Sequence, residues 1–557
     1  MPARVRLPRW TAALLVAAAA VVCSGCQPSE GAGPATDFLR IGTIAIVNSL
    51  NPWETTDQLP LDLQTDIYPK LLQYNLKTLT LAPGYATSWR ITDHGHVITF
   101  TLHRHTVWSD GRPLTASDVA WTINTMVKFQ RGATAAWASA VAGITRATVL
   151  SPDRVSIIYR TPGGDALSNL EQIPIMPEHI WAKDAVGKGK ALDQPTGAPT
   201  SGHPVVGAGP FLLVKYVPNQ VLLLIRNPRW FGPKPKIKGF GVELFANDDA
   251  LVAAMTAHDV DAATGDPNLP PTDIRPLARA HIRIEKRPSV AFNDLIINTN
   301  PKKIGHRELL NPLVTKAFEY ATDRREIDDI AYLGYAQAGS SIIPPATGSW
   351  YDRSIKPLPY DIAKANQLLD QAGYKRHGSG GLRWADGHPM SYTVLLSPDN
   401  GGEGLRTGEI MTNDFLKIGV KLTFQTIDDD ALQSEIEADH YRKFDLAMWG
   451  WDTFIDPTYM LDNMTCSQYY SNSDSGYCRG SYDKMFAEQE RTVNPAKRRA
   501  IVYRMQRMVY NARPYIVLQY LDVLEGWSRA WSGVVDSPDG WLSQLSYEPQ
   551  LEVHLTR

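Results

Sequence analysis

The sequence predicts a mixed α/β protein that is large enough for two lobes. Its 557 residues correspond to roughly three ordinary domains or two large ones. Apolar residues make up 43% of the chain and charged residues 20%, so the chain is able to bury a sizeable core and is not a disordered tail. Strand-like and helix-like patterns alternate along the chain, and this alternation is typical of α/β architecture.

The first residues have the features of an export signal. Several arginines precede an apolar run over residues 10–22, which is shorter than the ~20 residues that a membrane-spanning helix needs. Ser-Gly-Cys26 closes the segment and resembles the bacterial lipobox, in which the cysteine receives the lipid. We therefore predict a lipoprotein signal peptide over residues 1–25 with lipid attachment at Cys26. A Gly/Pro/Ser-rich tether is expected over residues 26–37.

Two segments have the patterns of strands. Residues 39–44 form an early apolar run, and residues 97–102 place Ile98, Phe100 and Leu102 on one face. We expect both segments to lie in sheets with that apolar face toward a core.

Three helix starts are also marked. Thr115 and Asp118 form a capping box, in which each side chain satisfies a backbone N–H group of the first turn. Asp361 is expected to cap a second helix that stops at Gly373, and Asn494 precedes a proline at the start of a third.

Cys466 and Cys478 are the cysteines that remain once the leader is removed and Cys26 is lipidated. In an oxidising extracytoplasmic compartment we expect them to form a disulfide that closes a surface loop. Metal ligation by the pair is less favoured because no histidine is adjacent.

Charge and motif content argue against several function classes. The net charge of -2 gives no electrostatic footprint for nucleic acid. The sequence holds none of the short motifs of nucleophilic hydrolases, zinc proteases or dinucleotide-binding proteins. The aspartates at residues 428–430 are more typical of an exposed helix start than of a cation site. We expect no catalytic residue, no metal, no cofactor and no nucleic-acid partner.

A series of short motifs runs in one order from about Ile41 to the C-terminus. These motifs occupy residues 81–89, 96–104, 107–119, 206–211, 226–230, 321–324, 361–365, 372–374 and 444–451. In content and order they resemble the family 5 extracellular solute-binding proteins, the peptide- and nickel-type receptors of ABC importers. The resemblance covers nearly the whole mature chain.

This resemblance implies a fold and a division into lobes. The family has the large variant of the type II periplasmic-binding-protein fold, in which two α/β lobes joined by a hinge enclose the ligand between them. We place lobe I, with an extra subdomain, at residues 38–290, lobe II at residues 291–514, and a return to lobe I at residues 515–557. The crossovers are expected near residues 289–293 and 513–520.

The resemblance also implies a role and partners. Such a protein captures a solute, with an oligopeptide as the leading ligand, and delivers it to the permease and ATPase subunits of an ABC importer. It is expected to act as a monomer at the outer face of the bacterial cytoplasmic membrane, held there by its N-terminal lipid.

Three regions are predicted to line the cleft. The first is an early loop, the second enters lobe II, and the third follows a strand and precedes the disulfide loop. Their candidate residues are Asn48, Asn51 and Trp53; Phe292, Asn293 and Asn298; and Trp449, Gly450, Trp451, Asp452, Thr453, Phe454 and Asp456.

The third region carries the most specific expectation. In the family's peptide receptors this stretch pairs with an extended peptide as an added strand, and an aspartate there meets the peptide's N-terminal ammonium. Here residues 450–457 are one residue shorter, so the family position falls on Thr453 or Phe454. Asp452 and Asp456 flank it and are both candidates, although a surface or turn role would also explain them.

Two other function classes stay open at the level of sequence. Trp449 and Trp451 point to the same side of a strand and would suit stacking on an oligosaccharide, while a metal chelate or haem would be a further non-peptide ligand. A cell-surface hydrolase is a remote alternative, because no nucleophile and base occur at a recognisable spacing.

Overall fold

The structure is a computed structural model that describes residues 37–47, 49–54, 58–161, 163–193, 205–264, 269–378, 381–469 and 473–556. The predicted signal peptide, the lipid-attachment residue Cys26 and the predicted tether before residue 37 lie outside these ranges. Within the ranges, no helix is both long and apolar enough to cross a bilayer.

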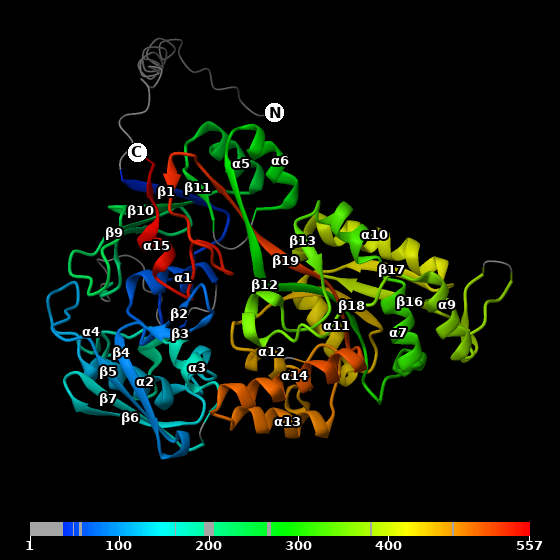
Figure 1. Ribbon diagram of the computed structural model, residues 1–557, viewed down its shortest axis with the longest axis horizontal. Coiled ribbons are helices and arrows are strands. Elements are labelled where there is room, and N and C mark those ends of the chain that lie inside the picture. Colours follow the sequence, from blue (N-terminus) through cyan, green and yellow to red (C-terminus); the bar gives the residue numbers. More distant parts are fainter. Residues whose placement is uncertain are drawn as a thin grey trace, which may run out of the picture.

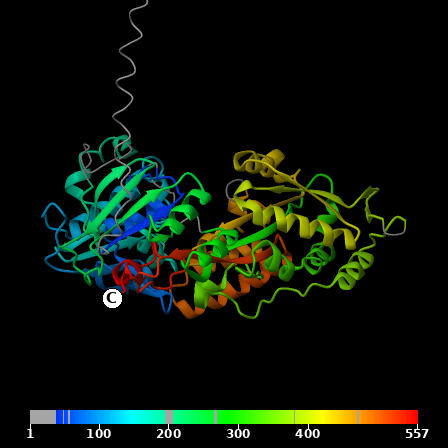
Figure 2. The same cartoon turned by 90° about the horizontal axis from the view of Figure 1, so that it is seen from above.

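Two lobes share one large mixed sheet (Figure 1). We call lobe I the body that contains β1 and α5, and lobe II the body that contains β16 and α10. In the described residues the sheet has eleven strands, and β12 (Arg283–Ile297) and β19 (Tyr515–Trp527) lie side by side at its centre. Figure 2 shows the lobes side by side and joined at their middle.

The strands on each side of this central pair belong to different lobes. On the lobe I side the order outward from β19 is β11 (Ala262–Ala263), β1 (Phe38–Thr43), β10 (Gly239–Leu244), β9 (Val221–Arg226) and β8 (Phe211–Val217). On the lobe II side the order outward from β12 is β18 (Leu446–Asp452), β16 (Ser391–Leu396) and β17 (Lys421–Thr426), while β13 (Ala336–Ala338) pairs with β19.

The antiparallel pairing of β12 with β19 is interrupted near its middle by two register shifts. The register runs from Arg283 opposite Trp527 to Ile296 opposite Tyr515 and shifts between Pro288 and Phe292 and again between Asn293 and Asp294. Proline has no N–H group to donate to the ladder and is typical of such irregular positions. The interruption falls in the segment where the first crossover is predicted.

The apolar cores follow this division. The largest cluster fills lobe I, and a smaller one lies beneath α5 (Asp248–Ala257) and α6 (Pro271–Arg279). Lobe II has one cluster on each face of its sheet, because successive residues of β12 point to opposite faces. Phe292 and Ile296 enter one cluster, and Leu295 and Ile297 enter the other.

Lobe I carries an extra subdomain. Its antiparallel sheet has the order β4 (Ala86–Thr92), β5 (Val97–Leu102), β7 (Arg154–Tyr159) and β6 (Ile144–Ser151), and α2 (Ala116–Phe129) packs on it. The neighbouring elements are α1 (Gln58–Ile67), β2 (Leu72–Asn75), β3 (Thr80–Pro83), α3 (Ala166–Gln172) and α4 (Glu178–Trp181).

The remaining helices lie mostly in lobe II. They are α7 (Pro312–Tyr320), α8 (Arg324–Glu326), α9 (Ile362–Gln371), α10 (Gly401–Lys417), α11 (Asp429–Tyr441), α12 (Thr458–Asp462), α13 (Gly480–Glu490) and α14 (Pro495–Ala512), with α15 (Glu548–Glu552) near the C-terminus of lobe I. Two further short strands, β14 (Trp384–Ala385) and β15 (His388–Pro389), form a hairpin, and β20 (Trp531–Ser532) pairs antiparallel with β21 (His554–Leu555) across the intervening α15.

The elements expected from sequence are confirmed. β1 and β5 form at the predicted segments, and the capping box of Thr115 and Asp118 is complete at the start of α2. Asp361 and Asn494 each accept a backbone N–H of the first turn of the helix that follows. The predicted disulfide between Cys466 and Cys478 is also present.

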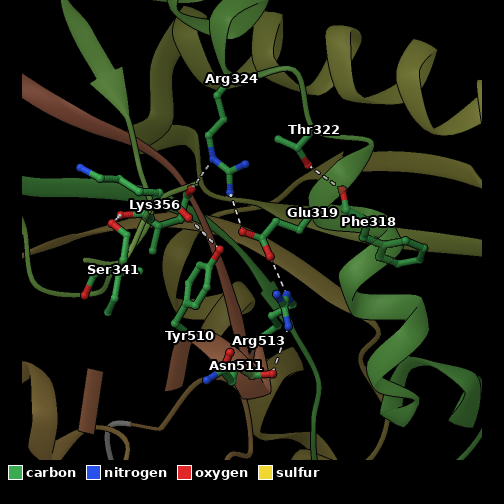
Figure 3. Close-up of polar contacts among 12 residues, drawn as sticks. Phe318, Glu319, Thr322, Arg324, Ser341, Lys356, Tyr510, Asn511 and Arg513 are labelled. Atoms are coloured by element: carbon green, nitrogen blue, oxygen red, sulfur yellow. Dashed lines mark hydrogen bonds and ion pairs between the residues drawn. The ribbon is translucent and has the colours of Figure 1, made fainter. Parts of the chain in front are cut away.

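A buried ion network fixes the point at which the chain enters β19 (Figure 3). Glu319 at the end of α7 accepts a hydrogen bond from Arg513, and Arg324 lies 3.8 Å away on its other side. Arg324 also donates to the carbonyl of Val517 in β19, at 2.9 Å. All three charged side chains are less than a tenth exposed, so each depends on the others for solvation.

Replacing Glu319 should therefore destabilise the fold strongly. Glu319→Ala leaves two buried guanidinium groups without their carboxylate, and we expect it to lower the free energy of unfolding by about 3–5 kcal/mol in chemical denaturation. Glu488→Ala is the matched control, since Glu488 pairs with Arg504 at 3.5 Å with both side chains more than half exposed. The control should lower the free energy of unfolding by less than about 1 kcal/mol. Equal decreases in the two variants would contradict the stabilising role of the Glu319 network.

Candidate functional site

A cleft of about 1060 Å³ lies between the lobes, beside the β12–β19 pair. Lobe I contributes Ile44, Asp248 and residues 269–271 to its walls. Lobe II contributes residues from α10, α11 and the end of β18, while β12 and β19 form the part between the lobes. In Figure 1 the corresponding helices α5 and α6 stand on the lobe I side of the central strands and α10 on the other side.

The strand directions explain why these residues meet. β1 and β10 are parallel in lobe I, and β16 runs parallel to both β17 and β18 in lobe II. Ligands of open α/β sheets bind outside the carboxyl ends of such strands. Ile44 follows β1, Ser397 follows β16, and Asp452 ends β18, so the cleft lies at carboxyl ends in both lobes.

The last part of β18 has a free edge toward the cleft. β16 pairs with β18 only as far as Met448, whereas β12 pairs with it to Asp452. The N–H of Ser397 donates to the carbonyl of Met448 at 3.4 Å, so the backbone groups of Met448 point to the β16 side. Because backbone direction alternates along a strand, those of Gly450 point the same way, where no described strand covers them.

Trp449 and Trp451 form an aromatic wall beside this edge. Their rings lie on the same face of β18, edge to face, with centroids 6.2 Å apart, and Tyr459 packs 6.4 Å from Trp451. Both tryptophans are half-buried and border the cleft, which confirms that they face the same side. A Cβ at Gly450 between them would collide with the side-chain oxygen of Asn293, so any larger residue here would displace the Asn293 amide.

Two buried carboxyl groups lie behind the aromatic wall. Asp294 in β12 stands directly opposite Trp449, and neither of its carboxylate oxygens has a hydrogen-bond partner in the described part of the chain. Asp474 accepts a hydrogen bond from the hydroxyl of Tyr515. Burial raises the pKa of Asp294 well above its usual value, and the charge of Asp474 raises it further. Burial also raises the pKa of Asp474, so the pair favours a protonated state.

Six of the predicted residues line the cleft. They are Phe292, Asn293, Trp449, Gly450, Trp451 and Asp452. Asn293 donates from its amide to the hydroxyl of Tyr332 at 2.6 Å, and Tyr332 also lines the cleft.

Three further predicted residues lie at a smaller cavity of about 150 Å³, which Asp452 also borders. They are Thr453, Phe454 and Asp456. Thr453 donates to the carbonyl of Val290 at 2.8 Å.

Asp456 is fully engaged within the protein. Its two oxygens accept from Arg498 at 2.6 and 2.7 Å, from the N–H of Thr458 at 3.0 Å and from the hydroxyl of Ser168 at 3.1 Å. Burial opposes its ionisation, but Arg498 outweighs burial and holds the pKa of Asp456 below its usual value. Because Ser168 belongs to α3, its hydrogen bond to Asp456 ties lobe II to the subdomain of lobe I. The contacts of Arg498, Thr458 and Ser168 occupy the Asp456 carboxylate, so Asp452 is the candidate for binding an ammonium group.

The other predicted residues do not reach the cleft. Asn51 and Trp53 are fully buried in lobe I, where Asn51 donates to the carbonyl of Leu192 and Trp53 packs on Trp181. Asn298 is fully buried and binds the carbonyls of the segment before β18. Asn48 lies outside the described residues.

Several residues of the cleft were not predicted. They include Asp248, Tyr332, Ser397, Asn400 and Glu403. The only sequence signal of Asp248, Asn400 and Glu403 is a position at a helix start, and that of Ser397 is a position just after a strand, whereas Tyr332 follows the end of a short helix and carries neither signal. The aspartates at residues 428–430 do begin α11 as expected, with Asp428 accepting from the N–H of Ala431, but Asp429 and Asp430 also line the cleft.

The described residues contain no group of three or more His, Cys, Asp or Glu side chains arranged to hold a metal ion. Within that part of the chain, the walls of the cleft include aromatic rings, carboxylates and backbone groups.

Comparison with known proteins gives one family. The sequence model of the bacterial extracellular solute-binding proteins, family 5 middle region, matches residues 80–472. The chain is 26% identical to Protein XP55 of Streptomyces lividans over 534 residues, which cover 95% of this chain and 92% of that protein. It is 25% identical to di/tripeptide-binding protein 1 of Pseudomonas aeruginosa over 492 residues, covering 82% and 84%.

Solved structures show the same two-lobed fold. NikA from Brucella suis, in complex with Fe(III)-EDTA, has a TM-score of 0.79 at 19% identity and covers 93% of this chain and 99% of that one. DppA from Helicobacter pylori, in complex with the peptide STSA, has a TM-score of 0.70 at 21% identity and covers 93% and 98%.

The carboxyl pair behind the aromatic wall generates a stability prediction. Because the native pKa of Asp294 is raised, the free energy of unfolding should fall as the pH rises from the unfolded-state pKa of about 4 toward the native value. Asparagine does not ionise, so Asp294→Asn avoids this pH-dependent decrease in the free energy of unfolding. We expect the variant to be more stable than the wild type by about 1–3 kcal/mol at about pH 8, and by less at about pH 4.

Urea denaturation at both pH values measures the effect. Asp259→Asn is the control, since Asp259 is exposed and borders neither cavity, and it should change stability by less than about 0.5 kcal/mol. If Asp294→Asn is no more stable than the wild type at the higher pH, ionisation of the buried Asp294 carboxyl group does not destabilise the fold and the prediction is wrong.

Proposed function

The chain belongs to the family 5 bacterial extracellular solute-binding proteins, and we propose that it is the peptide-capturing component of an ABC importer. The observation that carries this proposal is the free edge of β18, which opens into the cleft between the lobes. The members that it resembles are solute-binding proteins and not enzymes, so the hydrolase alternative is dropped.

An extended peptide would pair with this edge as an added strand. Backbone hydrogen bonds to Gly450 and its neighbours would supply affinity that does not depend on side-chain identity, while the walls of the cleft would select side chains. The cleft volume of about 1060 Å³ stands at the upper end of the ~300–1,000 Å³ usual for small-molecule sites and suits a short peptide. Di/tripeptide-binding protein 1 of Pseudomonas aeruginosa and the peptide complex of DppA from Helicobacter pylori support the same ligand class.

Asp452 is proposed as the anchor of the peptide's N-terminal ammonium. It ends β18, is exposed and borders both cavities, whereas the carboxylate of Asp456 is saturated by Arg498, Ser168 and Thr458. A carboxylate at the end of an added strand forms a short, charge-assisted hydrogen bond with an ammonium group, and the strength of such a bond grows when closure excludes water.

Binding is proposed to work by lobe closure about the β12–β19 pair. A ligand that contacts both lobes stabilises the closed arrangement over the open one by the difference in its binding free energy for the two. The interruption between Pro288 and Phe292 supports a boundary near residue 290, with residues 38–290 and 515–557 in lobe I and residues 291–514 in lobe II. No bond of the solute is made or broken.

Anchoring and delivery complete the proposal. The basic and apolar leader that ends in Ser-Gly-Cys26 supports lipid attachment at Cys26 on the outer face of the bacterial cytoplasmic membrane. From there, the loaded and closed protein would dock as a monomer on the permease of the importer.

The ammonium anchor is tested by calorimetry with matched peptides. We expect trialanine to bind and N-acetyl-trialanine to bind at least about tenfold more weakly, because acetylation removes the charge that Asp452 meets. Asp452→Asn should lose most of the discrimination between the two peptides, whereas the control Asp259→Asn should keep it. Equal affinity of the wild type for both peptides would contradict the proposal that Asp452 binds the N-terminal ammonium group.

The ligand class itself is tested on the protein as purified without refolding. Mass spectrometry of the released solute should show peptides with free N-termini. A sugar, a metal chelate or a haem as the retained solute would contradict the peptide proposal.

A further inference from the structure

The cleft is lined by charge of one sign. Its walls include six carboxylates, and no lysine, arginine or histidine is among the described residues that line it. The carboxylates belong to Asp248, Glu403, Asp429, Asp430, Asp452 and Asp522.

Glu403 and Asp522 are each offset by a cation outside the wall. Glu403 pairs with Arg406 at 2.6 Å, and Asp522 pairs with Lys286 at 3.0 Å. Asp248, Asp429 and Asp430 have no ion-pair partner in the described ranges, although Asp429 accepts a hydrogen bond from Ser397. The cleft therefore keeps a negative field that counter-ions or a ligand must balance.

The charges of the two lobes face one another. Asp248 and Asp249 begin α5, and Asp273 lies in the first turn of α6, all in lobe I. Burial raises the pKa of Asp273, and the charges of Asp248 and Asp249 and of Glu403 in lobe II raise it further. Because carboxylates of both lobes line the same cleft, closure of the empty cleft would strengthen the repulsion between them by bringing them together and excluding water.

Helix dipoles offset only part of the negative charge of these carboxylates. A helix N-terminus carries about half a positive elementary charge, which stabilises an acidic residue in the first turn. α5 and α11 each place two aspartates in the first turn, so their acidic charge exceeds what the dipole offsets. Capping of the helix N-termini therefore does not explain why α5 and α11 each carry a second aspartate in the first turn.

We infer that the cleft selects cationic peptides, namely short peptides that carry lysine or arginine side chains in addition to the N-terminal ammonium. This inference rests on the proposed function and names the substrate class of the same site. A cationic side chain would neutralise carboxylates of both lobes at once and so remove the repulsion that opposes closure. Trp449, Trp451 and Tyr459 offer aromatic faces to the same cations.

The experiment compares trilysine, trialanine and triglutamate by isothermal titration calorimetry on the wild-type protein. We expect trilysine to bind at least about tenfold more tightly than trialanine at about 0.1 M salt, and triglutamate to bind most weakly. The advantage of trilysine should shrink severalfold at about 1 M salt, where the Debye length falls from ~10 to ~3 Å.

A pair of double variants locates the effect. Asp248→Asn with Asp430→Asn removes one unpaired carboxylate from each lobe, and we expect the ratio of trilysine to trialanine affinity to fall at least about fivefold. Asp259→Asn with Glu435→Gln removes one exposed carboxylate from each lobe outside the cleft and should leave the ratio unchanged.

The outcomes separate this inference from the function on which it rests. Equal affinity for trilysine and trialanine, or a preference for triglutamate, overturns the cationic selectivity while peptide binding stands. A ratio that falls equally in both double variants assigns the preference to overall charge and overturns the role of the cleft. If none of the three peptides binds, both the peptide function and the selectivity are overturned.

Discussion

The pairing of β12 with β19 is the constraint on which the rest of the structure depends. These two strands carry one sheet through both lobes, so the carboxyl ends of β1 and β10 in lobe I and of β16 and β18 in lobe II meet beside them. The ion network of Glu319, Arg324 and Arg513 fixes the start of β19. The two register shifts in this pairing, between Pro288 and Phe292 and between Asn293 and Asp294, lie at the cleft, where a change of lobe angle needs backbone freedom.

The treatment of charge differs between scaffold and cleft. In the scaffold, the buried charge of Asp456 has a full set of partners, with four hydrogen bonds to its carboxylate. At the cleft, by contrast, Asp430 lines the wall without an ion-pair partner in the described residues. A protein that must hold a solute and release it has a physical reason to leave such groups unsatisfied until the solute arrives, since the free energy then gained favours closure.

Sequence reasoning reached the local features and missed those that depend on long-range packing. The capping box of α2, the strands and the disulfide follow from residues near one another in sequence, and the shared orientation of Trp449 and Trp451 follows from strand periodicity. Asn51 and Trp53 turned out to lie in the core of lobe I because the tryptophan finds aromatic partners there. The pairing of Asp294 with Asp474, and the approach of Asp273 to Glu403 across the lobes, join segments far apart in sequence, and no local pattern marks them.

The central claim is that a peptide bound at the edge of β18 draws the lobes together about the two central strands. Electron–electron distance measurement between spin labels at Thr256 on α5 and Glu409 on α10, both exposed and outside the cleft, tests it most directly. We predict a shorter and narrower distance distribution when a bound peptide saturates the protein. A distribution that does not change upon saturation would show a rigid body and would contradict the account.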